Sequence, residues 1–220
     1  MKYLKQKIIK FDYDRNFRNE DFFISKSNEH IISLLEKWPK WSKNFLNISG
    51  ESFSGKTHLV SIFLKKFKGI KLEANLLNNK DLDDIKIHQN IVIENMDHNL
   101  NEKFVYTLFN IIDQDNKYLI VTSQKPIVDI DFKLNDLKSR TKNFLLQKIE
   151  KPDDEMIYAL ILKHLSDRQI SIEKKLIYYI INRISRSYSK IHKFIYKIDE
   201  LSLKKKVSID LKIIKEVLGE

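Results

Sequence analysis

Cysteine is absent from this chain of 220 residues, and glycine and proline are scarce, with four and three copies. These absences exclude a disulfide-stapled scaffold and a collagen-like chain, and they leave no redox signature. No stretch reaches the roughly 18 uninterrupted apolar residues of a membrane span, and lysines interrupt the apolar residues of segment 1–10, where a secretory signal would lie. We therefore expect a cytoplasmic protein that has no membrane partner.

Positive charge exceeds negative charge, but the composition limits what this excess means. The sequence has 40 Lys and Arg against 30 Asp and Glu, which gives a formal net charge of +10 at pH 7. Cations clustered on one face would follow nucleic-acid phosphates. However, only 6 of the cations are Arg and only 2 residues are Ala, a skew expected of an AT-rich genome. We therefore expect contacts with DNA to be indirect or nonspecific.

Short apolar runs alternate with segments of helical periodicity in residues 21–150. This alternation predicts an α/β fold, with a three-layer core around a mostly parallel sheet. From Lys151 on the pattern is helical, so we expect an N-terminal arm over 1–20, the α/β domain over 21–150 and a small all-helical domain over 151–220. The expected strands are Phe45–Ile48, Ile70–Leu72, Ile91–Ile93, Tyr118–Val121 and Asn143–Ile149, and the helices of the last part lie near 153–167, 171–184, 187–203 and 209–218, with Val207-Ser208 as the one candidate strand there.

Residues 50–57, with the sequence GESFSGKT, satisfy the pattern G-x-x-x-x-G-K-[ST] without a mismatch. In this pattern the glycines let backbone N–H groups point at a β-phosphate, Lys56 neutralises phosphate oxygens, and the Thr57 hydroxyl ligates Mg²⁺. A chance match in a chain of this composition has a probability of roughly one in a thousand. An apolar run precedes the loop and an amphipathic helix follows it. The pattern therefore predicts a phosphate-binding loop.

The strand expected at 91–93 leads into Glu94 and Asn95. A carboxylate at this place holds the Mg²⁺ shell in P-loop ATPases, and the next residue is acidic in those that hydrolyse ATP. Glu94 reaches a metal through water, whereas the amide of Asn95 cannot act as a general base. We therefore expect slow or absent hydrolysis. Asp97 is an alternative base, against the interpretation that it caps the next segment.

Two further residues suit a nucleotide site. Thr122 ends an expected strand and would place a hydroxyl beside a γ-phosphate. Arg140 precedes the last strand, and in a chain dominated by lysine its guanidinium suits the nucleotide of a neighbouring subunit, against the alternative of a solvated surface side chain. The six histidines lack the H-E-x-x-H and Cys/His spacings, and no G-x-S-x-G motif is present. A zinc protease and a serine hydrolase are therefore excluded.

Taken in order, these motifs resemble the AAA+ ATPase module of the DnaA family of bacterial replication initiators, and most closely its shortened Hda type, which acts in regulatory inactivation of DnaA. The likeness runs from about residue 6 to 220. Segment 21–28, DFFISKSN, is similar to the motif that lines the adenine pocket, and LKSR at 137–140 is similar to the box whose Arg140 is the arginine finger. The resemblance implies that ADP or ATP with Mg²⁺ is bound by Phe22, Ile24, Asn28, Gly50, Ser54, Gly55, Lys56, Thr57, His58, Thr122 and Arg186, with the metal at Thr57 and Glu94.

The resemblance has departures and one addition. The lid arginine of the family would fall near Ser189, so that role passes to Arg186 or Lys190. The chain ends where the initiator would begin its DNA-binding domain, so recognition of origin DNA is not expected. Segment 6–11, QKIIKF, resembles the peptide with which Hda-like proteins bind the sliding clamp of DNA polymerase, through Gln6, Ile9 and Phe11. The alternative is an arm that packs on its own core.

Two functions of different class follow. The first is a regulator that holds an adenine nucleotide, docks on the sliding clamp and presents Arg140 in trans to ATP on DnaA, so that DnaA hydrolyses it. The second is an active, DNA-stimulated AAA+ ATPase, such as a helicase loader or a DnaA-like initiation factor, in which Lys56, Thr57 and Glu94 carry out hydrolysis. Self-association of the chain into a homo-oligomer is open under both.

Overall fold

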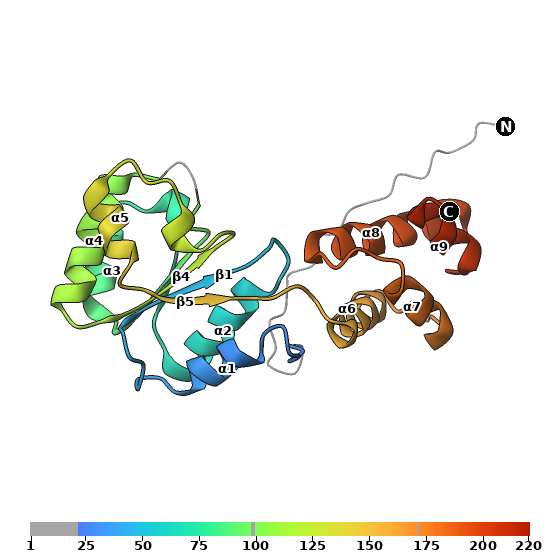
Figure 1. The fold of residues 1–220 in the computed structure, drawn as a ribbon, viewed down its shortest axis with the longest axis horizontal. Coiled ribbons are helices and arrows are strands. Elements are labelled where there is room, and N and C mark those ends of the chain that lie inside the picture. Colours follow the sequence, from blue (N-terminus) through green and yellow to red (C-terminus); the bar gives the residue numbers. More distant parts are fainter. Residues whose placement is uncertain (1–21, 98–99, 171) are drawn as a thin grey trace.

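The computed structural model describes residues 22–97, 100–170 and 172–220. The chain forms two lobes, an α/β core and a helical lid that follows the last strand of the core (Figure 1). The expected arm over 1–20, with Gln6, Ile9 and Phe11, lies outside the described residues. Within the described ranges, no helix has both the length and the apolar character that crossing a membrane requires.

Five parallel strands form the sheet of the core, in the order β2-β3-β4-β1-β5. The strand β1 lies between β4 and β5, so the loop that follows it leaves the carboxyl edge of the sheet among its central strands. Ligands bind at this edge in open α/β sheets. The expected α/β fold is confirmed. The strands are β1 (Phe45–Ser49), β2 (Ile70–Glu73), β3 (Asn90–Glu94), β4 (Tyr118–Ser123) and β5 (Leu145–Lys148).

Helices cover both faces of the sheet. Alternate residues of each strand face opposite sides, so Leu46 and Ile48 of β1 pack with α1 and α2, while Phe45 packs with α4. A central strand buried on both faces reads as a continuous apolar run, as in Ile91–Ile93. One face carries α1 (Glu29–Glu36) and α2 (Lys56–Phe67), and the other carries α3 (Asp81–Ile87), α4 (Glu102–Gln114) and α5 (Asn135–Thr141).

Both tryptophans of the chain lie in one aromatic cluster of the core. The ring of Trp38 is centred 4.7 Å from Phe67 and 5.5 Å from Tyr118, and Trp41 stacks on Phe63 at 5.7 Å. The indole N–H of Trp41 donates to the carbonyl oxygen of Leu34 in α1 at 2.7 Å. The cluster therefore joins α1, α2 and the start of β4.

Four helices form the lid around an apolar core of their own: α6 (Asp154–Ser166), α7 (Lys174–Ile181), α8 (Tyr188–Lys205) and α9 (Leu211–Leu218). Three of them begin at a capping side chain, since Asp153, Ser187 and Asp210 each accept a hydrogen bond from a backbone N–H of the first turn. The candidate strand at Val207-Ser208 is wrong. The N–H of Val207 instead donates to the carbonyl of Ser202 and closes the end of α8.

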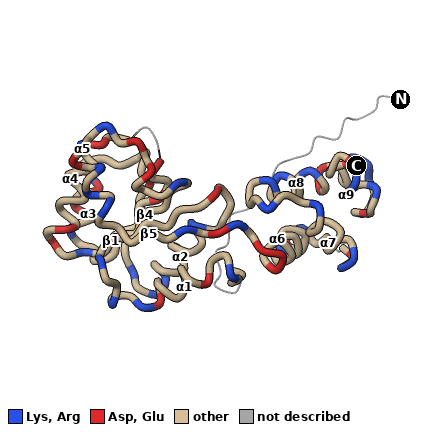
Figure 2. The backbone as a smooth tube through the Cα atoms, in the orientation of Figure 1, with Lys and Arg blue, Asp and Glu red and all other residues tan. Residues whose placement is uncertain are grey.

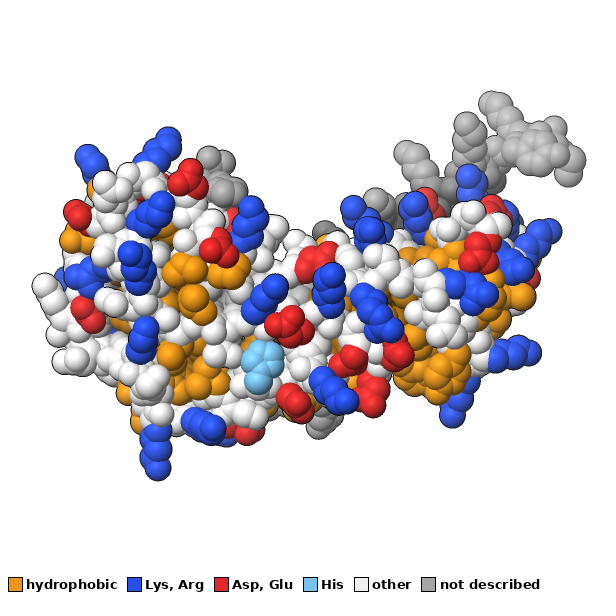
Figure 3. Space-filling view, in the orientation of Figure 1, with side chains coloured by type: hydrophobic (Ala, Val, Ile, Leu, Met, Phe, Trp, Pro, Cys, Tyr) orange, Lys and Arg blue, Asp and Glu red, His pale blue; other side chains and the backbone are white. Residues whose placement is uncertain are grey.

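Charged residues occur along both lobes (Figure 2). On the face seen in Figure 3, lysines and arginines are dispersed among acidic and apolar side chains. On this face the cations do not gather into one patch, and their distribution is that of a solvated, lysine-rich surface.

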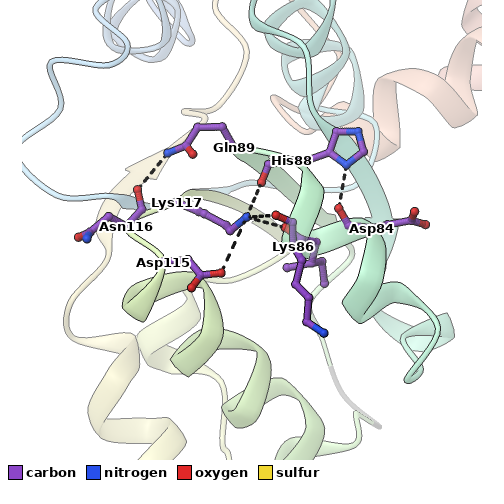
Figure 4. A network of polar contacts seen from close by, with 8 residues as sticks. Asp84, Lys86, His88, Gln89, Asp115, Asn116 and Lys117 are labelled. Atoms are coloured by element: carbon purple, nitrogen blue, oxygen red, sulfur yellow. Dashed lines mark hydrogen bonds and ion pairs between the residues drawn. The ribbon is translucent and has the colours of Figure 1, made fainter.

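A buried lysine terminates α3 (Figure 4). The ammonium of Lys117 donates to the carbonyl oxygens of Ile85, Lys86 and His88 at 3.0, 2.6 and 3.1 Å, and Asp115 lies 3.9 Å away. The last carbonyls of a helix have no partner within the helix and carry partial negative charge. Lys117, which directly precedes β4, donates hydrogen bonds to carbonyls at this end of α3, and its side chain is 8% exposed.

Replacing Lys117 with methionine is expected to lower the free energy of unfolding by about 2–3 kcal/mol, because three carbonyls lose a charged donor and one of the three hydrogen bonds is fully buried. Urea unfolding followed by circular dichroism measures this change. Lys86→Met is the control, since the Lys86 ammonium is exposed and pairs with Asp83 on its own helix. Equal stability losses in the two variants would contradict the capping role.

Candidate nucleotide-binding site

The loop 50–55 connects β1 to α2 at the carboxyl edge of the sheet. Gly55 has φ of 92°, in the left-handed region, and a Cβ atom there would lie 3.2 Å from the ring of Phe22. A Cβ atom on Gly50 would lie 2.9 Å from the Ser54 hydroxyl. Gly55 is therefore needed for its left-handed backbone, and an added Cβ atom on Gly50 would crowd the side chains of Ser54 and Ile149. The turn leads directly into α2, whose first backbone N–H groups suit an anion.

The ammonium of Lys56 lies inside this loop. It donates to the carbonyl oxygens of Gly50 and Glu51 at 2.6 and 2.9 Å. Burial lowers the pKa of Lys56, against the negative charges of Asp97, Glu94 and Glu51, which favour the ammonium. The loop thus holds a desolvated cation where the sequence predicts phosphate oxygens.

Two buried oxygen atoms near this cation have no hydrogen-bond partner among the residues that the structure describes: the Ser54 hydroxyl and Oε1 of Glu94. Oε2 of Glu94 pairs with the Lys71 ammonium at 3.0 Å, and the Glu94 side chain is 1% exposed. Buried polar atoms without partners are rare and indicate water, an ion or a ligand. The site therefore fits a nucleotide phosphate with a hydrated divalent metal, and Thr57 and Glu94 would hold the metal.

Asn95 follows β3 in a left-handed conformation with φ of 59°. Its amide nitrogen donates to Oε2 of Glu73 at 2.9 Å, and its backbone N–H donates to the hydroxyl of fully buried Thr122 at 3.1 Å. Asp97 accepts a hydrogen bond from the backbone N–H of Gln124 at 3.0 Å. These contacts tie the end of β3 to the ends of β2 and β4.

The residues expected to line an adenine pocket fall into two groups. Phe22 lies over Gly55, and its ring meets His58 edge-on with centroids 4.9 Å apart. Asn28 instead shapes its own segment, because its side chain accepts from the N–H of Ser25 and donates to the carbonyl of Phe23. Ile24 is 52% exposed. Phe22 and His58 are thus the members of this set that lie at the loop.

Arg186 lies just before α8. Its guanidinium pairs with Asp154 at 2.6 Å and donates to the carbonyl of Pro152 at 3.4 Å. The side chain therefore holds the start of α8 to the start of α6, where the chain passes from core to lid.

Arg140 lies at the opposite edge of the sheet from the loop. It lies in the last turn of α5, pairs with Asp113 of α4 at 3.0 Å and lines a pocket with Asn44 and Phe45, at the start of β1. The loop follows the other end of β1, and a strand of five residues spans about 16 Å. Arg140 therefore does not meet the loop of its own chain.

One acidic residue of the site is not predicted from the sequence. The carboxylate of Glu51 contacts Ser187, Tyr188 and Ser189 at the start of α8. Beside it, the ring of Phe53 stacks on His192 at 3.8 Å with an interplanar angle of 16°. No local signal in the sequence could have found these contacts, because their partners lie more than 130 residues further along the chain.

His164 of α6 lies edge-on to His192 with ring centroids 5.4 Å apart. Burial, the charge of His192 and the cations Arg168 and Lys163 outweigh Asp167 and lower the pKa of His164 from 6.5 to about 4. Because the unfolded chain binds this proton below about pH 6.5 and the folded chain only below about pH 4, stability is unaffected above that window and falls within it as the pH decreases.

We expect the pKa shift of His164 to remove about 2–3 kcal/mol of stability between pH 7 and pH 4.5. Urea unfolding of the wild type and His164→Gln at both pH values measures it. Other groups titrate in both proteins, so the quantity that matters is the difference between their two losses. Equal losses would contradict the burial of a neutral His164.

No family model matches the chain. In sequence, the chain is 25% identical over 228 residues to the chromosomal replication initiator protein DnaA of Thermoanaerobacter sp. (strain X514), and the alignment covers 91% of this chain and 51% of that protein. The chain thus spans about half the length of the curated relative it matches.

Two solved structures share the fold. Domain III of the Thermotoga maritima replication initiation protein DnaA superposes with a TM-score of 0.72 and 16% identity, covering 94% of this chain and 97% of that one. AMPPCP-bound DnaA from Aquifex aeolicus superposes with a TM-score of 0.67 and 17% identity, covering 88% and 70%. The expected likeness to the DnaA family is therefore confirmed at the level of the fold: the chain has a DnaA-like AAA+ fold, similar to that of domain III of DnaA.

Proposed function

We propose that this chain is an adenine-nucleotide-binding regulator of replication initiation, of the Hda type. It holds ADP or ATP with Mg²⁺ at the loop 50–57, docks on the sliding clamp through segment 6–11, and presents Arg140 to ATP on DnaA. The nucleotide assignment is supported by the buried Lys56 ammonium, the unpartnered oxygens of Ser54 and Glu94, and the AMPPCP in the related DnaA structure.

The observation that carries the proposal is the placement of Arg140 and the loop at opposite edges of one sheet. An arginine so placed is available to the nucleotide of a second protein and not to its own. A guanidinium supplied in trans stabilises the negative charge of a phosphoryl-transfer transition state. The chain's part in the reaction is to orient this side chain at the end of α5.

The contacts around Asn95 and Glu94 support weak hydrolysis by the chain itself. The Asn95 side chain is an amide, is bonded to Glu73, and cannot take a proton from water. Lys71 neutralises one oxygen of Glu94, which leaves the other for the metal shell. The site is therefore better built to retain a nucleotide than to turn it over.

The proposal is tested by measuring ATP hydrolysis in a mixture of DnaA, DNA-loaded sliding clamp, ATP and this chain. We expect the wild type to accelerate hydrolysis on DnaA only when the clamp is present. When this chain is at limiting concentration, Phe11→Ala is expected to reduce the acceleration at least tenfold, because an apolar anchor of the docking peptide is lost.

The alternative function predicts a different result in the same assay. An active ATPase would hydrolyse ATP without DnaA, faster with DNA, and would stop with Lys56→Ala. Such a result would replace the regulator with a motor or a loader. A chain that neither accelerates DnaA nor hydrolyses ATP would contradict both functions.

A further inference from the structure

A carboxylate of the phosphate-binding loop lies against the first turn of a lid helix. Oε1 of Glu51 accepts hydrogen bonds from the hydroxyls of Ser187, at 2.5 Å, and Ser189, and Oε2 accepts from the backbone N–H of Tyr188 at 2.9 Å. The first N–H groups of a helix have no partner within the helix and carry partial positive charge. Three donors of α8 thus converge on one anion that belongs to the other lobe.

The backbone of the same residue contacts the cation of the site. The carbonyl oxygen of Glu51 accepts a hydrogen bond from the Lys56 ammonium at 2.9 Å, beside that of Gly50 at 2.6 Å. One residue therefore contacts both the Lys56 ammonium and the start of α8, the helix that begins the second half of the lid. The stack of Phe53 on His192 lies across the same junction.

The hydrogen-bond donors around the Glu51 carboxyl group favour its ionised form. Burial raises the pKa of Glu51, but hydrogen bonds from Ser187, Ser189 and Tyr188 outweigh it, and the pKa is lowered. The carboxyl group is therefore ionised at neutral pH. Hydrogen bonds to a charged group contribute more than those between neutral groups.

We infer that Glu51 is a positioning residue whose carboxylate holds α8 against the phosphate-binding loop and thereby slows the release of a bound adenosine diphosphate or triphosphate. The inference rests on the proposed nucleotide site. In the wild type the lid remains seated beside Lys56. Without the carboxylate, the donors of α8 turn to water and the lid moves about the connection 149–153, which follows β5.

Spin labels on the full chain test the seating of the lid without nucleotide. The chain has no native cysteine, so Asn79→Cys in the core and Lys175→Cys in the lid, both exposed, give one labelled pair. Glu51→Ala is expected to broaden the distance distribution between the labels. Glu155→Ala, which removes an exposed carboxylate of the lid, is expected to leave it unchanged.

Dissociation of fluorescent ADP, chased with unlabelled ADP, tests the effect on the site. We expect Glu51→Ala to release it about tenfold faster, Glu155→Ala at the wild-type rate, and Ser189→Ala in between. Because Glu51 and Ser189 would act through one contact, the double variant should release ADP no faster than Glu51→Ala.

The label distances and the rate of ADP release together distinguish a failure of the Glu51 contact from a failure of the proposed nucleotide binding. An unchanged distance distribution in Glu51→Ala overturns the inference, and so does a broadened distribution with unchanged ADP release. Wild-type protein that binds no ADP would instead remove the proposed nucleotide site. In that case the label distances alone decide whether Glu51 seats the lid.

Discussion

Replacing Arg140 with alanine is expected to lower the stimulated rate of ATP hydrolysis on DnaA by about 10³-fold or more, the size of effect typical of an arginine supplied in trans. The guanidinium lies near the end of α5, 29% exposed, where it pairs with Asp113 and lies over the ring of Tyr106. An exposed ion pair of this kind contributes about 0–1 kcal/mol, so it releases the arginine at little cost. A lysine at this position cannot reproduce the planar fork of donors.

The Arg140 experiment needs two controls. Arg183→Ala removes an arginine that pairs with Glu220 in the lid, and we expect normal stimulation. Asp113→Asn breaks the ion pair but keeps the arginine, and we expect a change of no more than about fivefold. Full stimulation by Arg140→Ala would show that this chain acts on DnaA without contributing a catalytic side chain.

Replacing Lys56 with methionine is expected to weaken ADP binding by about 10²- to 10⁴-fold, because the ammonium that would give charge-assisted hydrogen bonds to phosphate oxygens is lost. Methionine keeps the aliphatic stem that packs in the loop, although the carbonyls of Gly50 and Glu51 lose their donor. Isothermal titration with ADP measures the affinity.

Lys66→Met is the matched control for Lys56, since Lys66 is an exposed lysine of the same helix. A melting temperature within a few degrees of the wild type ensures that the affinities compare folded proteins. If Lys56→Met bound ADP as tightly as the wild type, the loop would not hold the phosphates.

The fold could be predicted because its three central strands, β3, β4 and β1, are short, mostly apolar runs that are buried on both faces. Ile91–Ile93 is an example, since all three side chains are fully buried and the run needs no knowledge of its neighbours. The helix α5 was not expected, although it carries Arg140. Only Leu137 and Thr141 of its seven residues are buried, so it lacks the apolar stripe that identifies a helix in a sequence.

The candidate site also has one part that the sequence predicts and another part that it does not. The turn 50–57 has a linear pattern, and its glycines and lysine are recognised by spacing alone. The pairing of Lys71 with Glu94 depends instead on β2 lying beside β3, with Glu73 opposite Glu94. The contact of Glu51 with α8 depends on how the lid packs on the core. Such contacts follow from tertiary structure, and a single sequence carries no signal for them.

The aromatic cluster of the core makes this two-lobed chain unusually easy to follow during unfolding. Trp38 and Trp41 are the two tryptophans of the chain, and both pack against aromatic side chains of α2 in the core. Indole fluorescence therefore reports on the core alone. The lid contributes tyrosines and no tryptophan. A lag between the indole signal and the helical signal would therefore reveal a state in which one lobe has melted while the other remains folded.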